Sequence, residues 1–115
     1  MKDVRQIVGP GALIGVSTHG IGQARRAVLE GASYLGAGPT FPSGTKAFTH
    51  FPGLNYLREV ASEITLPVFA IGGIDHSNVA KVTEAGINRI AVTAAVTEAD
   101  DPAEAARELR AALVQ

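Results

Sequence analysis

The sequence predicts an α/β fold of four parallel βα units, which is half of a closed barrel of the (β/α) TIM-barrel type. Short runs rich in β-branched and aliphatic residues alternate along the 115 residues with longer amphipathic segments, the order expected of consecutive βαβ units. The hydrophobic fraction is 46%, with no Trp, two Tyr and four Phe. The core must therefore be aliphatic, as in parallel sheets covered by helices.

Each expected strand is a short apolar run that ends at Gly or at polar residues. The four strands are expected at residues 13–17, 33–38, 68–71 and 89–93. Helices are expected between them at residues 21–30, 54–64 and 77–84, with Gly31 and Gly86 ending the first and third. Residues 4–10 have the pattern of the end of another helix.

The last helix has the clearest local signal. Asp101 is a natural N-cap, Pro102 suits the first helical position, and Glu104 can close a capping box.

A faint internal repeat supports a barrel built from repeated units. Residues 28–32 resemble residues 82–86, and each segment precedes an expected strand. A closed barrel of this class needs eight units, so four make half of one. Such a half has exposed strand edges and an uncovered inner face, which predict association with a missing half or with a second copy.

Composition favours a soluble cytoplasmic protein. The formal net charge is −1, and no basic cluster predicts nucleic-acid binding. No apolar run approaches the roughly 20 residues that a transmembrane helix needs, and the first residues lack the apolar stretch of a signal peptide. The absence of Cys fits a reducing compartment.

In a β/α barrel the chemistry takes place at the carboxyl ends of the strands. Polar residues and glycines follow the expected strands at residues 17–19, 38–46, 72–73 and 93–94. Gly73 allows a phosphate to approach the backbone, because glycine has no Cβ in the way. The ends of the last two strands of a barrel often bind phosphate through backbone N–H groups.

The loop at residues 38–46 carries donors suited to phosphate. It holds hydroxyls at Ser43 and Thr45 and an ammonium at Lys46, with Gly44 as its most flexible position. The alternative is an ordinary solvated loop, but loops on rigid scaffolds often carry function.

Taken together, these motifs resemble those of a known family. Residues 13–19, 31–46, 69–74 and 101–107 resemble, in order and spacing, the carboxyl-terminal half of thiamine-phosphate synthase. The resemblance covers nearly all of residues 1–115, which we treat as one domain without the amino-terminal half.

The resemblance implies a transferase that joins an aminopyrimidine methyl diphosphate to a thiazole phosphate and releases pyrophosphate. It implies that Ser17 and Lys46 contact the diphosphate as catalytic residues. It also implies that the thiazole substrate binds at Ser43, Gly44 and Thr45. The phosphate of that substrate would bind at Gly73, Thr93 and Ala94.

Three departures from the family pattern affect these expectations. Ser43 stands where the family usually has Thr, and Ala94 stands where it commonly has Ser. The family's Mg²⁺-binding aspartates and its pyrophosphate motif lie in the amino-terminal half and have no counterpart here. Mg²⁺ is therefore expected for the intact enzyme, with no metal ligand in this chain, and the isolated chain is expected to be incomplete.

Two alternatives stay open. A related thiazole tautomerase has a histidine at the position of His19, but its family lacks the ending Thr45-Lys46. A non-catalytic phosphate-binding module would fit the missing Mg²⁺ ligands and Ala94. His50 and His76 have no metal-ligand partners at suitable spacing.

The remaining charged residues are interpreted as structural or surface residues rather than as parts of a site. Asp75 is interpreted as a helix cap rather than a base. Arg25 and Arg26 are expected on the solvent-exposed side of a helix.

Overall fold

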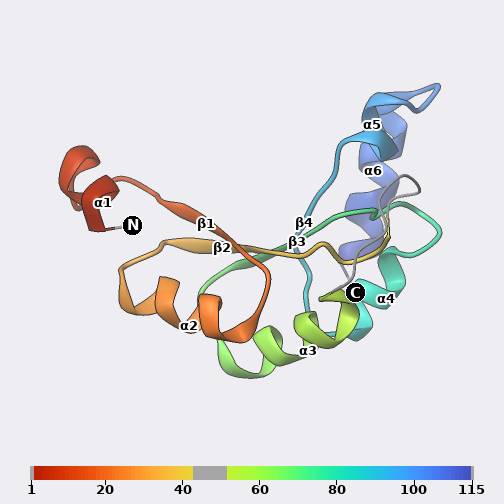
Figure 1. Cartoon of the computed structure of the whole chain (residues 1–115). Coiled ribbons are helices and arrows are strands. Elements are labelled where there is room, and N and C mark those ends of the chain that lie inside the picture. The colour runs from red at the N-terminus through yellow and green to blue at the C-terminus, as the bar shows by residue number, and fades with distance from the viewer. Residues whose placement is uncertain (1, 43–51, 115) are drawn as a thin grey trace.

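The computed structural model describes residues 2–42 and 52–114. Within them, four parallel strands form one sheet in the order β1-β2-β3-β4, and helices connect the strands. This confirms the predicted α/β arrangement of four parallel βα units (Figure 1). The strands are β1 Gly15–Thr18, β2 Tyr34–Ala37, β3 Val68–Ile71 and β4 Ile90–Ala91. The helices are α1 Lys2–Val8, α2 Ile21–Leu29, α3 Gly53–Glu63, α4 Val79–Glu84, α5 Ala94–Thr97 and α6 Pro102–Leu113.

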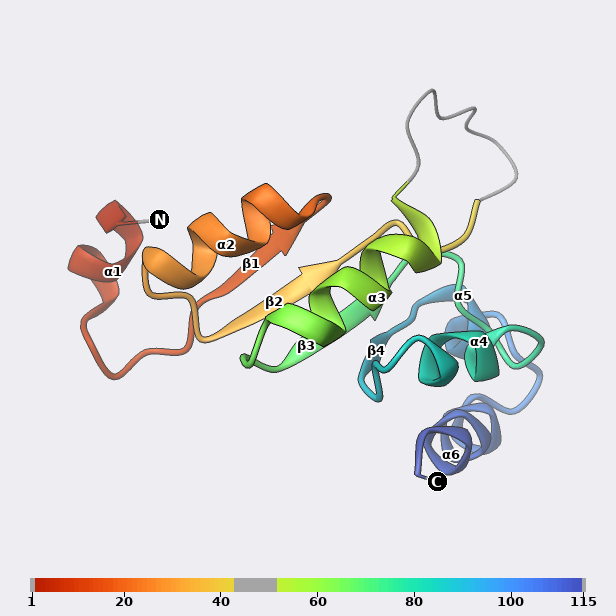
Figure 2. The same cartoon turned by 90° about the horizontal axis from the view of Figure 1, so that it is seen from below.

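The helices cover only one face of the sheet. In Figure 1, α2 and α3 lie below the strands, and Figure 2 shows the same two helices crossing in front of the sheet when the molecule is seen from below. Leu35 and Ala70 are fully buried on that face, against Leu57 and Val60 of α3. The core is therefore aliphatic, as composition predicts, and lies between the sheet and its helices.

A buried hydroxyl pair ties the helix layer to the sheet. Thr18 at the end of β1 donates to the Gly36 carbonyl at 2.8 Å, and its oxygen lies 2.6 Å from the hydroxyl of Tyr56 in α3. Because Thr18 has a single hydroxyl proton, Tyr56 is the donor in the second bond. Burial raises the pKa of Tyr56, since the charged phenolate is disfavoured away from water.

Local signals in the sequence placed the helix ends well. Gly31 and Gly86 follow the C-caps of α2 and α4 with φ of 94° and 102°, the left-handed conformation that glycine adopts without steric cost. The side chain of Asp101 accepts from the Glu104 amide at 3.1 Å, which confirms the N-cap of α6. The carboxylate of Glu104 accepts from Arg107 instead of closing the capping box.

The boundaries of two strands differ from prediction. The strand expected at residues 13–17 begins at Gly15, and Leu13 before it is 82% exposed. The strand expected at residues 89–93 is reduced to Ile90–Ala91, because Thr93 turns out of the sheet to become the N-cap residue of α5. Among the described residues β4 pairs only with β3, and this single ladder fixes just two residues in register.

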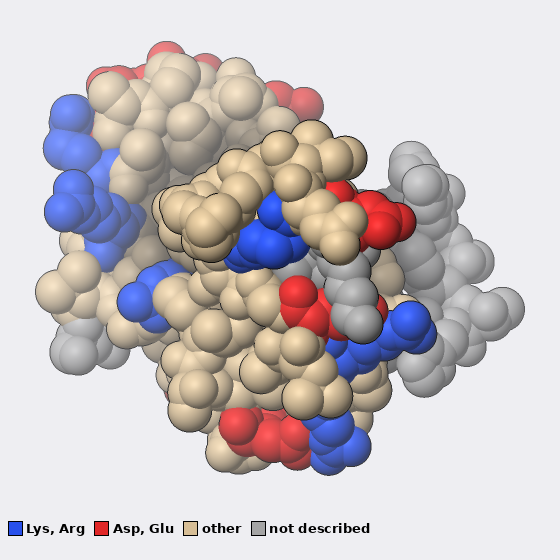
Figure 3. Space-filling view, turned by 90° about the vertical axis from the view of Figure 1, so that its left-hand side faces the viewer, with Lys and Arg blue, Asp and Glu red and all other residues tan. Residues whose placement is uncertain are grey.

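Charged residues of both signs lie on the surface. The face in Figure 3 shows Lys and Arg as well as Asp and Glu, separated by wide uncharged areas. Arg25 and Arg26 are exposed, as predicted, and Arg25 makes a two-bond ion pair with Glu63 of α3. None of the helices in residues 2–42 and 52–114 is long and apolar enough to cross a membrane.

Candidate phosphate-binding site

Those predicted site residues that the structure describes lie at the carboxyl ends of the strands. Ser17 is on β1, the Gly72-Gly73 pair follows β3, and Thr93 follows β4. Because all four strands are parallel, these positions share one edge of the sheet.

Hydrogen bonds join the segment that follows β2 to the segment that follows β3. Thr40 donates to the Ile71 carbonyl from both its amide and its hydroxyl, each at 2.9 Å, and the Phe41 amide donates to Gly72 at 3.1 Å. The hydroxyl of Thr40 is buried, so this contact fixes where the loop after β2 leaves the sheet.

Both glycines of the pair are needed for this contact. Gly72 and Gly73 have φ of 103° and 66°, which other residues rarely adopt. A Cβ on Gly72 would lie 2.8 Å from the Cα of Pro39, and one on Gly73 would lie 2.9 Å from the Phe41 carbonyl oxygen. The pair therefore has a packing role in addition to any contact with a ligand.

The predicted phosphate residues lie in one place. Gly73, Thr93 and Ala94 line a single pocket of about 500 Å³ at the ends of β3 and β4. Among the hydrogen bonds between described residues, none has the amide of Gly73, Ala94 or Ala95 as its donor. Open backbone N–H groups beside a glycine can bind the oxygens of a phosphate.

Two acidic residues also line the pocket. Asp75 and Glu98 line it, and its described lining contains no Lys, Arg or His. Hydrogen bonds from Ser77, whose hydroxyl is 2.6 Å and whose amide is 2.8 Å away, lower the pKa of Asp75 and keep it ionised. Within the described lining, an anion would meet backbone donors and the hydroxyl of Thr93, with no cation.

The structure gives Asp75 a capping role, close to the predicted one. Its side chain caps the turn that precedes α4, and its carbonyl accepts from Val79 at the start of that helix. Glu98 was not singled out from sequence. It is the C-cap residue of the short helix α5, and no motif surrounds it that would mark it as part of a site.

Ser17 lies next to this pocket but does not line it. The exposed side chain of Ser17 lines a smaller neighbouring pocket of about 170 Å³, together with Gly38 and Gly72. Gly72 lines both pockets, so the Gly72-Gly73 loop separates Ser17 from the Thr93–Ala94 segment.

His19 lines the smaller pocket and is already hydrogen-bonded. Its Nδ1 lies 2.7 Å from the Gly38 carbonyl, and its amide donates to the Gln23 side chain. A carbonyl only accepts, so this bond requires a proton on Nδ1. The contact fits the interpretation of His19 as a residue that covers the strand end.

Several predicted residues fall outside the described part of the chain. Ser43, Gly44, Thr45, Lys46 and His50 all lie in residues 43–51. His76 is described, and its Nε2 lies 3.2 Å from both the Ala105 carbonyl and a Glu108 carboxylate oxygen. The described residues contain no cluster of three or more His, Cys, Asp or Glu that could hold a metal ion.

Comparison with known proteins gives consistent matches. The family model described as thiamine monophosphate synthase matches residues 1–96. A thiamine-phosphate synthase of Mycobacterium sp. strain KMS is 50% identical over 111 residues, covering 96% of this chain and 49% of the relative. One from Rhodopirellula baltica is 47% identical over 112 residues, covering 93% of this chain and 30% of the relative. The chain thus spans half or less of the length of these relatives.

A solved structure agrees with the sequence matches. Thiamine phosphate pyrophosphorylase from Pyrococcus furiosus superposes with a TM-score of 0.85 at 37% identity, covering 97% of this chain and 53% of that one. The fold is thus of the TIM-barrel type, and the resemblance read from the motifs is confirmed. On the family match and the identity across nearly its whole length, the chain belongs to the thiamine monophosphate synthase family.

Proposed function

We propose that this chain is the carboxyl-terminal half of a thiamine-phosphate synthase and binds the phosphate of the thiazole substrate. The whole enzyme would condense an aminopyrimidine methyl diphosphate with thiazole phosphate to give thiamine phosphate and pyrophosphate. The observation that carries this proposal is the pocket in which Gly73, Thr93 and Ala94 come together, in a chain of this family.

Backbone geometry supports phosphate binding at this pocket. Amides that donate to no other described residue line it, and the two glycines let an oxygen atom come close to the main chain. Donors on a fixed backbone are already oriented before the ligand arrives, so binding does not have to order them.

Ser17 and Lys46 are proposed to act on the diphosphate. In the reaction, the bond from the pyrimidine methylene carbon to the diphosphate oxygen breaks, and the thiazole nitrogen bonds to that carbon. The Ser17 hydroxyl is exposed at the strand end and could donate to a diphosphate oxygen. The Lys46 ammonium would stabilise the negative charge that builds up on the leaving pyrophosphate. Ser43, Gly44 and Thr45 are proposed to hold the thiazole substrate.

Magnesium stays part of the proposal, with its ligands outside this chain. The described residues contain no cluster of three or more side chains that could hold a metal ion. Bound to the intact enzyme, Mg²⁺ would neutralise charge on the pyrophosphate. A cytoplasmic location belongs to the same proposal, because a chain without Cys suits a reducing compartment.

The phosphate pocket is tested by restoring the hydroxyl that the family commonly has. Ala94 is exposed, so Ala94→Ser should fold normally and add one donor to the pocket. We expect thiazole phosphate to bind about three to ten times more tightly, because one hydrogen bond contributes about 1 kcal/mol. Calorimetric titration measures the affinity. Ala103→Ser, an exposed position of α6, is the matched control and should leave it unchanged.

Catalysis needs a separate assay. Thiamine phosphate formation from both substrates and Mg²⁺ is measured with this chain alone and with this chain joined to the other half of the Mycobacterium relative. We expect activity only in the joined protein, and Lys46→Ala should abolish it. If thiazole phosphate binds but the joined protein is inactive, the chain is a non-catalytic phosphate-binding module. If Lys46→Ala retains a thiazole tautomerase activity, the tautomerase alternative is correct.

A further inference from the structure

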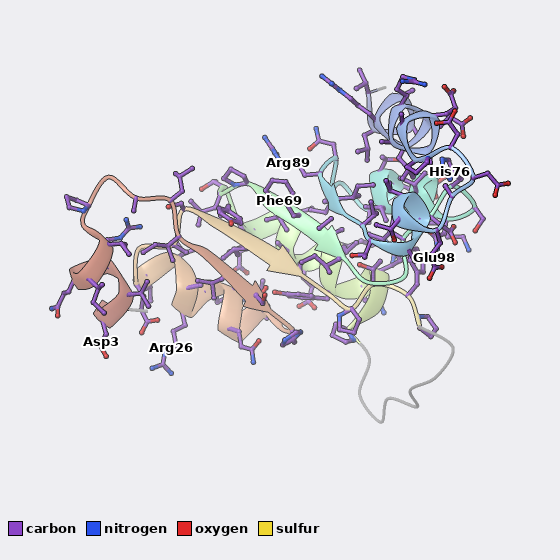
Figure 4. The ribbon with its side chains drawn as sticks, turned by 90° about the horizontal axis from the view of Figure 1, so that it is seen from above. Asp3, Arg26, Phe69, His76, Arg89 and Glu98 are labelled. Atoms are coloured by element: carbon purple, nitrogen blue, oxygen red, sulfur yellow. The ribbon has the colours of Figure 1, made fainter. Side chains whose placement is uncertain are left out.

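The side chain of Asn78 spans the loop between β3 and α4. Its Nδ2 donates to the Gly73 carbonyl at 2.8 Å, and its Oδ1 accepts from the Asp75 amide at 2.8 Å. Gly73 and Asp75 line the phosphate pocket at the ends of β3 and β4, whereas Asn78 does not. Figure 4 shows this part of the molecule, with His76 of the loop and Glu98 of α5 labelled at the same end. Any effect of Asn78 on the pocket is therefore exerted through the backbone of this loop.

Asn78 occupies a helix-capping position without capping the helix. It is the N-cap residue of α4, and its side chain makes no capping hydrogen bond. An asparagine at this position ordinarily accepts from an amide of the first helical turn. Here the amide group of the side chain turns back to the loop, where it meets one acceptor and one donor. Because a carbonyl only accepts and an N–H only donates, a side chain that carries both functions is needed to bind them together.

The bond to Gly73 also determines where the next amide points. The Gly73–Ile74 peptide is trans, because the cis bond among the described residues is that of Gly38 and Pro39. In a trans peptide the C=O and N–H groups point in opposite directions, so the Ile74 N–H is directed away from Asn78. Ile74 lines the phosphate pocket and is 5% exposed. Its amide is the donor in none of the hydrogen bonds between described residues.

An unpaired amide at this place points to a ligand. Backbone N–H groups of buried residues almost always have an acceptor. An oxygen atom of a phosphate in the pocket would supply one for Ile74, beside the open amide of Gly73. Two successive amides that bind one anion form a common anion-binding arrangement of the main chain.

We propose that Asn78 is a positioning residue of the phosphate pocket, which fixes the Gly73–Ile74 peptide so that the Ile74 N–H donates to a phosphate oxygen. Glycine makes such a contact necessary, because a residue without a Cβ lets the adjoining peptide rotate. Without Asn78 the loop would have to be ordered when phosphate binds, and this ordering would weaken binding. The inference rests on the proposed function, since it adds a donor and a positioning residue to the same phosphate site.

Titration with inorganic phosphate, followed by NMR of the ¹⁵N-labelled chain, tests the inference. In the unmodified chain the Ile74 amide proton should shift downfield as phosphate binds, because it gains a hydrogen bond to an anion. Asn78→Ala should weaken phosphate binding about five- to thirtyfold, the ratio that corresponds to ordering one backbone residue on binding. Asn78→Ser should have the same effect, since it keeps a good N-cap residue but has a single hydroxyl in place of the two polar atoms.

Ser77→Ala is the matched control from the same loop. The Ser77 hydroxyl donates to the Asp75 carboxylate at 2.6 Å. Its removal therefore takes one hydrogen bond from the loop and leaves both bonds of Asn78 in place. Phosphate should bind to Ser77→Ala as tightly as to the unmodified chain, with the same shift of the Ile74 amide. Circular dichroism checks that the variants fold.

The outcomes separate this inference from the proposed function. If phosphate binds to Asn78→Ser as tightly as to the unmodified chain, the inference is overturned while the phosphate site stands. An Ile74 amide that does not respond to bound phosphate would overturn it too, as would a loss of affinity in Ser77→Ala equal to that in Asn78→Ser. If the unmodified chain binds no phosphate, the proposed phosphate site is wrong and the inference falls with it.

Discussion

At the scale of single residues, Glu98 changes what the pocket can bind. Glu98 lines the same pocket as Gly73 and Ala94, and the described lining has no cation to offset its negative charge. Glu98→Gln removes one negative charge near the bound anion. We expect inorganic phosphate to bind about two to five times more tightly, with a gain that shrinks as salt screens the repulsion.

A phosphate titration at low and high salt measures this effect. Glu84→Gln on α4 is the control, because Glu84 is exposed and does not line this pocket. Equal affinities in the two variants would show that Glu98 has no electrostatic role. If phosphate binds to neither variant nor to the unmodified chain, the site itself is misplaced.

The buried hydroxyl of Tyr56 gives a second prediction at this scale. Burial raises the pKa of Tyr56 above the ordinary value of 10.0. As pH rises past about 10, the unfolded chain loses this proton while the folded chain keeps it. The contribution of Tyr56 to stability is therefore complete below that pH and is lost as pH rises through the higher folded pKa. Tyr56→Phe should cost about 1 kcal/mol near neutral pH, from the lost bond to Thr18.

The same variant should lose less stability at alkaline pH than the unmodified chain. Urea unfolding at about pH 8 and about pH 10.5 gives the comparison. Tyr34→Phe, which removes the other tyrosine hydroxyl, serves as the control and should keep the full alkaline loss. An unchanged pH dependence in Tyr56→Phe would contradict the burial effect.

At the scale of elements, two glycines in different surroundings predict opposite results. Gly22 lies within α2, and a Cβ there meets nothing within 4 Å. Gly22→Ala should stabilise the protein by about 0.5–1 kcal/mol, because alanine is the better helix former. Gly72 has φ of 103°, and a Cβ there meets the Pro39 backbone at 2.8 Å, so Gly72→Ala should destabilise it by about 1–3 kcal/mol.

Chemical denaturation of the two alanine variants checks both signs. A destabilising Gly22→Ala would mean that α2 needs flexibility at that position. A neutral Gly72→Ala would mean that the Pro39–Phe41 segment can move away from the β3 loop.

Sequence predicted the elements where short-range signals decide them. Gly31, Gly86 and Asp101 act within a turn of their own helix, so their roles could be predicted without knowing the fold. The shortening of β4 could not, because apolar residues continue past Ala91 and only the turn at Thr93 ends the strand. The same distinction holds for the residues of the candidate site. Glycines at strand ends were identified by type and position, whereas Glu98 enters the pocket only through the packing of α5.

At the scale of the whole molecule, the open sheet separates two questions: how many βα units the chain contains, and what completes the barrel. Four βα units and the family resemblance predict half of a barrel, and the parallel sheet confirms the four units. What completes the barrel depends on surfaces that face away from the chain's own core. Leu13 and Ile71 are as apolar as core residues, and only the three-dimensional arrangement shows that they are exposed on the face of the sheet that α2 and α3 leave uncovered.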